Sequence, residues 1–274
     1  MTRKAQPFSS KQLPVTESAV SVGAGRDLPP HIVIVGGCGG IGRELIRSLL
    51  RQQCDISILD LPVSIERHPP PEAVRAFSVD ATDASAVKQV VVDIQNQSGA
   101  VHGFVYLAGF MPELLALDNT PESVLRNSLE VNLLTAWQTT TAFLPLLRAG
   151  RNSAVVLAAS GLGAYARPGM GSYSIAKAGI IAMTRQFALE QAPDVRINAV
   201  APAAVDTAFL RGGTGRSLED EEPHVDIDGY KTIVPLQRIA QPDDVTGPIE
   251  FLLSSASKYM TGQTLYINGG TYTG

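Results

Sequence analysis

The sequence predicts an α/β protein in which one doubly wound, seven-stranded parallel sheet is covered by helices on both faces. Two observations support this prediction. From His31 onward, short runs of β-branched and other apolar residues alternate with amphipathic segments. The apolar runs are continuous, without polar residues in alternation, as expected of parallel strands that are buried on both faces.

The expected elements follow one another along the chain. Strands are predicted over residues 32–35, 56–59, 76–79, 103–107, 154–158, 196–200 and 264–267. The first helix is indicated by Ile41, Leu45 and Leu49, which recur at helical spacing, with arginines on another face. Further helices are predicted over residues 84–97, 121–148, 172–191 and 242–255.

Composition limits the classes of function. The 274 residues carry a net charge of −4 and a pI near 5.6, without a basic stretch, which argues against nucleic-acid binding. No window reaches the roughly 18 apolar residues that span a membrane. The two cysteines and four histidines are scattered, so no metal site is expected. The cysteine usage fits a reducing compartment, and we expect a cytoplasmic location.

A glycine-rich turn joins the first predicted strand to the first helix. It consists of Gly36, Gly37, Cys38, Gly39, Gly40, Ile41 and Gly42. Glycines allow a sharp turn and a close approach of the backbone to a pyrophosphate, and the helix N-terminus offers free N–H groups. A merely tight turn would also use glycines, but the strand–turn–helix context favours dinucleotide binding.

The boundaries follow from composition. Residues 1–28, rich in Ser, Pro, Gly and Gln, are expected to form a flexible extension. Residues 29–274 are expected to form a dinucleotide-binding catalytic domain. Within it, residues 208–230 are long and irregular enough to be a substrate loop, and the acidic run 219–222 inside them is most simply solvated.

The second and third predicted strands both lead to an aspartate. Asp60 is placed to accept hydrogen bonds from the ribose hydroxyls of adenosine and to repel a 2′-phosphate. NAD is therefore favoured over NADP, although Arg67 lies close enough in the sequence for its guanidinium to reach a 2′-phosphate. Asp80 could meet the adenine amino group, or could equally be a solvated strand end.

The chemical centre is predicted at Tyr173 and Lys177. Residues four apart share one helix face, so an ammonium would lie beside a phenol and lower its pKa towards the working range. Such a tyrosine can exchange a proton with an alcohol or a carbonyl. The pair alone is weak evidence, but Ser160 ends the fifth predicted strand, where its hydroxyl can hold a substrate oxygen.

Together these residues resemble the short-chain dehydrogenase/reductase family, classical type, over about residues 30–274. The glycine turn resembles the family's TGxxxGxG, with Val35 replacing the threonine. Ser160, Tyr173 and Lys177 match its serine and YxxxK. Asn132 matches an asparagine that in the family helps to hold a water and a proton relay to the lysine.

The resemblance implies a set of cofactor contacts and an assembly. Lys177 would bind the nicotinamide ribose, and the family is usually a homotetramer, sometimes a dimer, built on the helices predicted at 121–148 and 172–191. The expected contacts of NAD are Gly36, Cys38, Gly39, Gly40, Ile41, Gly42, Asp60, Asp80, Ala81, Ala108, Gly109, Tyr173, Lys177, Pro202, Val205 and Thr207.

The chain departs from the family pattern at two points. The family's NNAG is replaced by Tyr106-Leu107-Ala108-Gly109, so an asparagine that usually braces neighbouring strands is missing. The family's Pro-Gly is replaced by Pro202-Ala203. Neither change removes a group that transfers a proton.

The strand ends also suggest a substrate pocket. Its candidate residues are mostly apolar: Phe110, Met111, Leu162, Tyr165, Met170, Phe209 and Leu210. They favour a secondary alcohol or ketone with apolar bulk, oxidised or reduced with NAD. Arg167 and Arg211 could meet an anionic group, but a solvated arginine is the simpler interpretation. One alternative is a non-catalytic nucleotide-binding regulator or scaffold. Another is an epimerase or dehydratase, but such relatives usually carry a larger C-terminal substrate domain, and too little chain follows the sixth strand.

Overall fold

A computed structural model describes residues 31–217 and 222–273 of the chain. The expected N-terminal extension lies outside the described residues, as does most of the acidic run 219–222. The strands of the sheet are β1 (His31–Val35), β2 (Asp55–Asp60), β3 (Val74–Ser78), β4 (Gly103–Tyr106), β5 (Ser153–Ala158), β6 (Val195–Pro202) and β7 (Thr264–Ile267). Each predicted strand is present, with ends that differ by at most two residues.

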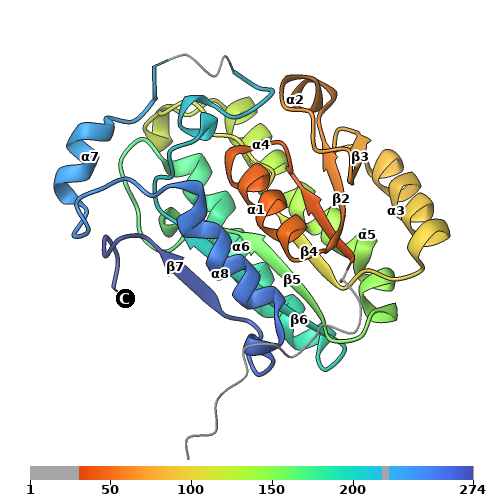
Figure 1. The fold of residues 1–274 in the computed structure, drawn as a ribbon. Coiled ribbons are helices and arrows are strands. Elements are labelled where there is room, and N and C mark those ends of the chain that lie inside the picture. Colours follow the sequence, from red (N-terminus) through yellow and green to blue (C-terminus); the bar gives the residue numbers. More distant parts are fainter. Residues whose placement is uncertain (1–30, 218–221, 274) are drawn as a thin grey trace, which may run out of the picture.

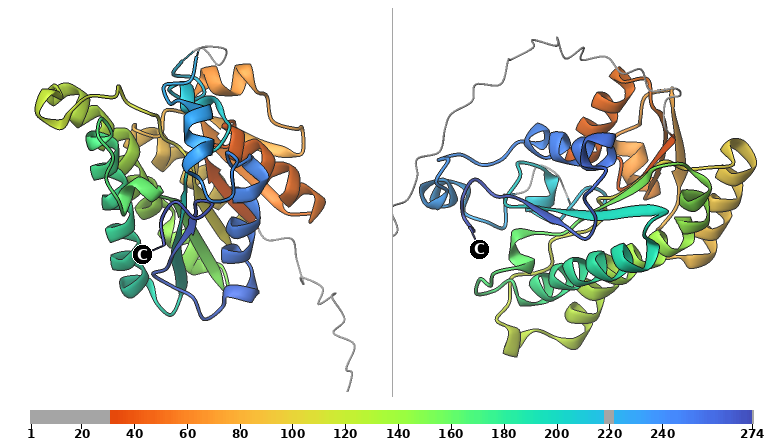
Figure 2. Two further views of the ribbon diagram at one scale, coloured as in Figure 1. Left: turned by 90° about the vertical axis from the view of Figure 1, so that its left-hand side faces the viewer. Right: turned by 90° about the horizontal axis from the view of Figure 1, so that it is seen from below.

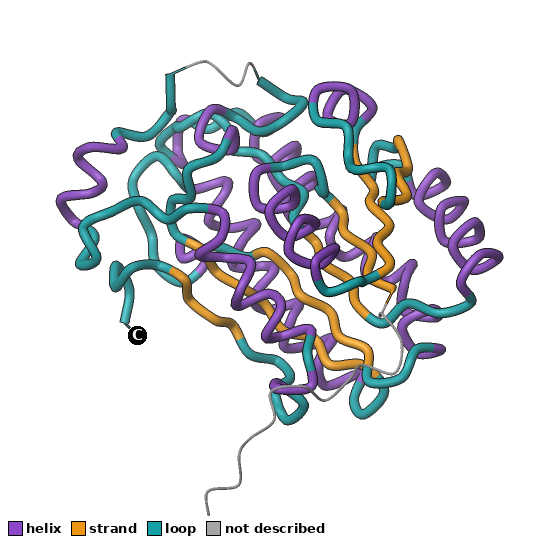
Figure 3. Tube along the Cα trace, viewed as in Figure 1, coloured by secondary structure: helices purple, strands orange, loops and turns teal. Residues whose placement is uncertain are grey.

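The strands form one parallel sheet in the order β3-β2-β1-β4-β5-β6-β7, which confirms the predicted fold (Figures 1 and 3). The register places Ile32 beside both Ile56 and Gly103. The chain leaves β1 towards β2 on one side, and returns to place β4 on the other. Such a reversal opens a crevice at the carboxyl ends of the two central strands, where ligands bind in sheets of this kind.

Helices cover both faces of the sheet, as Figure 2 shows from two directions. They are α1 (Gly40–Arg51), α2 (Pro62–Arg67), α3 (Ala84–Ser98), α4 (Glu122–Leu129), α5 (Thr135–Ala149), α6 (Gly171–Gln191), α7 (Ile227–Ile233) and α8 (Pro242–Leu253). Helices α3, α5 and α6 pack on one face, while α1 and α8 pack together on the other. Within β1, Val33 points to the first face and Ile34 to the second, and both are fully buried.

The structure corrects the predicted helices in two places. The helix expected over 121–148 is interrupted between α4 and α5 by a π-helical turn at Glu130–Leu134. Two short helices, α2 and α7, were not expected. The loop predicted at 208–230 contains a 3₁₀ turn at Ala208–Arg211 and the start of α7, so its described part is more ordered than its composition suggests.

Candidate active site

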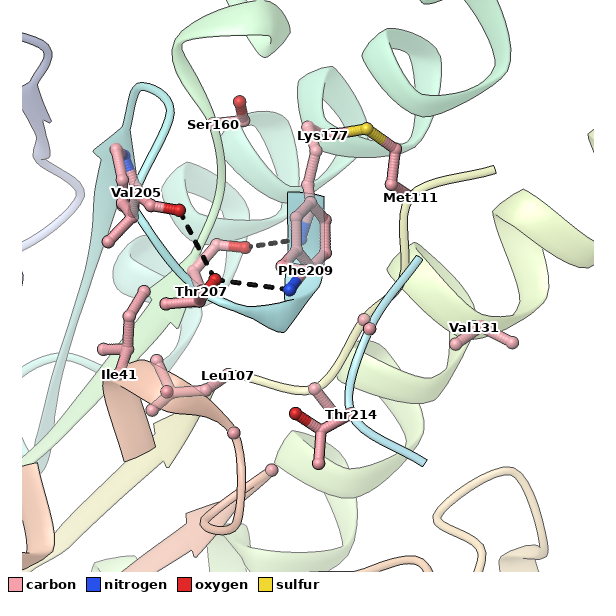
Figure 4. Close-up of a pocket in the computed structure, with 18 of the residues that line it drawn as sticks. Ile41, Leu107, Met111, Val131, Ser160, Lys177, Val205, Thr207, Phe209 and Thr214 are labelled. Carbon is pink, nitrogen blue, oxygen red and sulfur yellow. Dashed lines mark hydrogen bonds between the residues drawn. The ribbon is translucent and has the colours of Figure 1, made fainter. Parts of the chain in front are cut away.

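A single long cavity runs across the carboxyl ends of the central strands (Figure 4). We call one part the nucleotide half, formed by residues that follow β1 to β4. It is lined by Gly36, Gly39, Gly40, Ile41, Gly42, Asp60, Leu61, Asp80, Ala81, Thr82, Leu107, Ala108 and Gly109. The other part, the substrate half, is lined by Met111, Leu162, Tyr165, Arg167, Met170, Phe209, Leu210, Val225 and Tyr230. Ser160, Tyr173 and Lys177 lie where the halves meet.

At four of its five glycines, the turn leaves no room for a side chain. Gly36 has a φ of +87°, and a Cβ there would lie 2.7 Å from the backbone nitrogen of Ala108. A Cβ on Gly42 would lie 2.5 Å from the carbonyl oxygen of Gly36. Gly40 lies against the side chain of Thr207, which comes from the loop after β6. The turn is therefore a bare backbone cradle at the N-terminus of α1, which fits a dinucleotide pyrophosphate.

Asp60 shapes the end of the cradle where an adenosine ribose would lie. Its carboxylate accepts hydrogen bonds from the backbone nitrogens of Cys38 and Leu61, both at 2.8 Å. Burial raises the pKa of Asp60, and these two N–H donors offset part of that rise. Arg67, which could have offered a positive charge to a 2′-phosphate, donates to the carbonyl oxygen of Ser217 at 2.8 Å.

All but one of the expected cofactor contacts line this cavity, and the exception is Cys38. Its side chain is only 1% exposed, and its backbone nitrogen is bonded to Asp60. Burial raises the pKa of the Cys38 thiol to about 12. Cys38 therefore supports the turn and its Asp60 contact from beneath the cavity wall.

The predicted chemical residues come together at the junction of the two halves. Tyr173 and Lys177 are buried on one face of α6, and the Lys177 Nζ lies 5.6 Å from the Tyr173 ring centroid. The same Nζ donates to the Ala158 carbonyl oxygen at 2.8 Å, which anchors the lysine to the end of β5. Ser160 follows β5, and its Oγ accepts from the Leu162 nitrogen at 3.2 Å.

The expected lowering of the Tyr173 pKa is wrong for the protein alone. Burial raises the pKa of Tyr173 above its ordinary value, and a hydrogen bond with Ser160 offsets part of the rise. Burial also lowers the pKa of Lys177 to about 8, so desolvation acts strongly on both groups. The neighbouring charge can be expected from the sequence, but the enclosure of both side chains depends on distant segments and cannot.

Asn132 lies in the π-helical turn, and its amide group is fixed by Phe110. Its Oδ1 accepts from the Phe110 nitrogen at 3.1 Å, and its Nδ2 donates to the Phe110 carbonyl at 3.2 Å. A Cβ on Gly109 would lie 2.7 Å from the Asn132 Oδ1 and 3.8 Å from the Lys177 Nζ. The absence of a side chain on Gly109 thus leaves space for both Asn132 and Lys177, and the π turn, a feature frequent at functional sites, holds the asparagine there.

The departure from the family pattern at Tyr106 has its own bracing contact. Tyr106 is fully buried at the end of β4, and its hydroxyl donates to the Val131 carbonyl at 2.9 Å. The backbone nitrogen of Leu107 donates to the Val35 carbonyl at 2.8 Å. A tyrosine hydroxyl therefore joins the strand to the turn that carries Asn132. At the second departure, Ala203 lines the cavity and bonds through its nitrogen to Ile267.

The substrate half contains every predicted pocket residue except Phe110. Phe110 uses its backbone to hold Asn132, and the Arg216 guanidinium lies 5.2 Å from its ring centroid. The Phe209 nitrogen donates to the Thr207 hydroxyl at 3.3 Å, a bond drawn in Figure 4, and the Phe209 ring is 5.8 Å from that of Tyr173. Val225 and Tyr230 also line this half and were not predicted, because nothing in their spacing shows that the segment after residue 222 returns to the cavity.

The segment that follows Phe209 also reaches the nucleotide half. The Gly212 carbonyl accepts from the Met111 nitrogen at 3.3 Å, and the Thr214 carbonyl accepts from the Ser64 hydroxyl at 3.4 Å. Together with the bond between Arg67 and Ser217, these contacts tie residues 212–217 to α2 and to the loop after β4. The loop after β6 thus covers part of both halves.

Two further features are absent from the described residues. No group of three or more His, Cys, Asp or Glu side chains there is arranged to hold a metal ion. Among the helices of the described part, none has the length and apolar character needed to cross a membrane.

The chain is similar to known proteins over most of its length. The family model described as enoyl-(acyl carrier protein) reductase matches residues 36–272. The 3-oxoacyl-(acyl-carrier-protein) reductase FabG of Thermotoga maritima is 29% identical over 245 residues, which cover 87% of this chain and 96% of that protein. The protein of the same name from Staphylococcus aureus is 27% identical over 248 residues, covering 88% and 97%. An oxidoreductase structure from Burkholderia thailandensis has a TM-score of 0.74 at 29% identity, covering 90% and 94%.

Proposed function

The chain belongs to the short-chain dehydrogenase/reductase family, and on this premise we propose that it interconverts a secondary alcohol and a ketone with NAD. Membership makes it an oxidoreductase of carbonyl or alcohol substrates that uses a nicotinamide cofactor. The choice of NAD, the roles of individual residues and the apolar character of the substrate are our proposal.

One observation supports the proposal above all: Ser160, Tyr173 and Lys177 line the cavity at the point where its nucleotide half meets its substrate half. A nicotinamide cofactor bound in the nucleotide half supplies the hydride acceptor for oxidation and the hydride donor for reduction. Ser160 holds the substrate oxygen by a hydrogen bond. Tyr173 takes the proton from the alcohol oxygen, or returns it to the ketone oxygen in the reverse direction.

Lys177 and Asn132 support this proton transfer. A protonated Lys177 beside Tyr173 favours the phenolate, and the positive charge of an oxidised nicotinamide would act in the same direction. This is the effect needed to reverse the rise in the Tyr173 pKa that burial causes. Asn132, held by Phe110, would keep its amide beside the lysine and align a proton relay towards it.

The preference for NAD rests on Asp60. Its carboxylate is fixed by two backbone donors and lines the cavity, so it can accept from ribose hydroxyls and would repel a 2′-phosphate. Arg67 is bonded to Ser217, and the residue after Asp60 is the uncharged Leu61. These contacts oppose binding of NADP at this position.

We further propose that the protein is a homotetramer built on α4, α5 and α6. Large apolar side chains are exposed there, namely Trp137 on α5 and Ile175 and Leu189 on α6. Exposed apolar groups on neighbouring helices are typical of subunit interfaces. Sedimentation of the purified protein would test this assembly, and a monomer at all concentrations would refute it.

The test of the proposed function is Tyr173→Phe, assayed with NAD over a panel of secondary alcohols and ketones. We expect kcat/KM to fall about a thousandfold, because the proton donor and acceptor is lost, while NAD binding is kept. Activity near that of the wild type would refute the role of Tyr173. If the unchanged protein binds NAD but turns over no member of the panel, the alternative of a non-catalytic nucleotide-binding protein replaces the proposal.

A further inference from the structure

Arg167 places a positive charge in the substrate half of the cavity that the proposed function does not explain. Arg167 follows the 3₁₀ turn after β5 and lines this half together with Tyr165 and Tyr230. Its guanidinium carbon lies 5.9 Å from the Tyr165 ring centroid and 5.6 Å from the Tyr230 ring centroid. Both distances fall within the range of cation–π contacts, so the guanidinium is a positioned group.

Arg167 has no acidic partner among the described residues. It takes part in none of the ion pairs found there. The acidic side chains that line the cavity are Asp60 and Asp80, and both lie in the nucleotide half, at the ends of β2 and β3. The described walls around the guanidinium therefore offer rings and apolar groups but no negative charge, which is costly for a half-buried cation.

Tyr230 gives a second, independent indication of a missing ligand. The residue is 8% exposed and lines the cavity, and its hydroxyl makes no hydrogen bond among the described residues. Burial raises the pKa of Tyr230. The Ala204 backbone and the Thr271 hydroxyl offset part of this rise. Both lie near the Tyr230 hydroxyl without meeting the geometry of a hydrogen bond. A buried hydroxyl without a partner is unfavourable unless a ligand supplies one.

Neighbouring contacts hold these two groups in place. The Tyr165 ring is stacked on Tyr272 at 5.6 Å, and Tyr272 meets the edge of Tyr266 at 5.0 Å. A Cβ on Gly161 would lie 3.0 Å from Tyr165, so this ring packs directly against the backbone next to Ser160. On the other side, the side chain of Asp226 caps the helix that carries Tyr230. The two rings that contact Arg167 are thus held in place from both sides of the chain.

We propose that Arg167 and Tyr230 bind a carboxylate of the substrate, which is then a hydroxy acid in its reduced form and an oxo acid in its oxidised form. This rests on the function proposed above, which it makes more specific. A guanidinium presents two parallel N–H donors to a carboxylate, and the Tyr230 hydroxyl adds a third donor. The positive charge of Arg167 is opposite to that of a carboxylate, and the apolar residues of the same half would contact the carbon chain between the two functional groups.

The experiment compares hydroxy acids with their methyl esters, which keep the shape and lose the charge. The spacing between hydroxyl and carboxylate is varied through the series, and kcat/KM is measured with NAD at neutral pH. At the best spacing we expect the acid to exceed its ester by about tenfold or more. Arg167→Met should lower this acid-to-ester ratio by about 10- to 100-fold, and Tyr230→Phe by about three- to tenfold.

Two further variants separate the charge from other effects. Arg167→Lys keeps the positive charge but lacks the two parallel N–H donors of a guanidinium, and should give an intermediate acid-to-ester ratio. Arg185→Met removes an exposed arginine of α6 outside the cavity and should leave the ratio within about twofold of the wild type. A ratio near one at every spacing, or equal effects of Arg167→Met and Arg185→Met, overturns the carboxylate site while leaving the proposed function intact.

A binding measurement covers the case in which no compound of the series is turned over. Calorimetry with NAD present compares hexanoate with 1-hexanol on the wild type and on Arg167→Met. Weakening of hexanoate binding by about tenfold or more, with a smaller effect on hexanol, supports the site even though the proposed reaction has failed. Equal affinity of the two proteins for hexanoate overturns it.

Discussion

The two halves of the cavity are built differently. In the nucleotide half, the wall is largely backbone: a glycine turn in which a Cβ added to Gly36 or Gly42 would collide with main-chain atoms, and an aspartate held by two main-chain donors. In the substrate half, the wall consists of large side chains from the turn after β5 and the loop after β6, such as Tyr165 and Phe209. A backbone wall suits a ligand common to many enzymes, whereas side chains can be exchanged to accept different substrates.

The first prediction tests whether the backbone wall tolerates any change. Gly42→Ala should weaken NAD binding by about a thousandfold and lower the melting temperature, because the new Cβ would lie 2.5 Å from one main-chain oxygen and 2.6 Å from another. Gly247→Ala is the matched control: this exposed glycine of α8 has open space at its Cβ position, and the change should leave NAD binding intact and stabilise the helix slightly. Calorimetry and thermal unfolding measure both effects. NAD affinity near that of the wild type in Gly42→Ala would show that the turn is not a tight cradle.

The second prediction concerns Lys177, at the junction of the halves. Burial lowers its pKa from 10.5 to about 8, which corresponds to about 3 kcal/mol of destabilisation of the folded apoprotein at neutral pH. Lys177→Met removes the buried charge and should raise the free energy of unfolding at pH 7 by up to this amount. Loss of the hydrogen bond to Ala158 would reduce the gain.

The pH dependence identifies the cause. Between about pH 8 and 10.5 the unfolded chain keeps its lysine proton while the folded protein has lost it, so the wild type gains stability as the pH rises. The advantage of Lys177→Met over the wild type should therefore shrink from pH 7 to pH 9.5. Denaturant titrations at several pH values measure it, and a difference that is constant with pH would contradict the buried, weakly basic lysine.

The same contrast explains which parts could be predicted from sequence. Strands such as β1 and β5 are continuous apolar runs, and the glycine turn, Asp60 and the Tyr173–Lys177 spacing are local patterns, so they were found without coordinates. The π turn at Asn132 was missed because its residues suit an α-helix equally well. The direction of the Tyr173 pKa depends on enclosure by distant segments, and the approach of Tyr230 to Arg167 joins residues far apart in the chain. Such long-range packing leaves no periodic trace in the sequence.

The third prediction tests the cofactor preference assigned to the nucleotide half. Asp60→Asn keeps the shape of the side chain and removes its negative charge, so it should weaken NAD binding about tenfold and lower the ratio of NAD to NADP affinity by a similar factor. Asp80→Asn, at the neighbouring strand end, should affect both cofactors alike. Fluorescence titration with each cofactor provides the comparison. Tighter binding of NADP than of NAD by the wild type would reject the assignment of Asp60.

The last prediction asks whether the two halves act independently. Phe209 lines the substrate half, and its ring lies 5.8 Å from that of Tyr173. Phe209→Ala should raise KM for apolar substrates by about three- to tenfold, because apolar contact area is lost, while kcat changes less and NAD affinity stays within about twofold. Phe251→Ala on α8, outside the cavity, is the control for loss of a half-exposed ring and should leave KM unchanged.

A different outcome would be equally informative, because residues 212–217 join the segment after Phe209 to α2 and to the loop after β4. If Phe209→Ala weakens the binding of NAD as strongly as the binding of substrate, the loop after β6 moves as a unit that contacts both ligands. The cavity could then not be divided into a backbone half and a side-chain half that bind independently. If only KM moves, the contacts at α2 hold the loop in place without the ring. The substrate wall can then vary residue by residue while the nucleotide wall stays as it is.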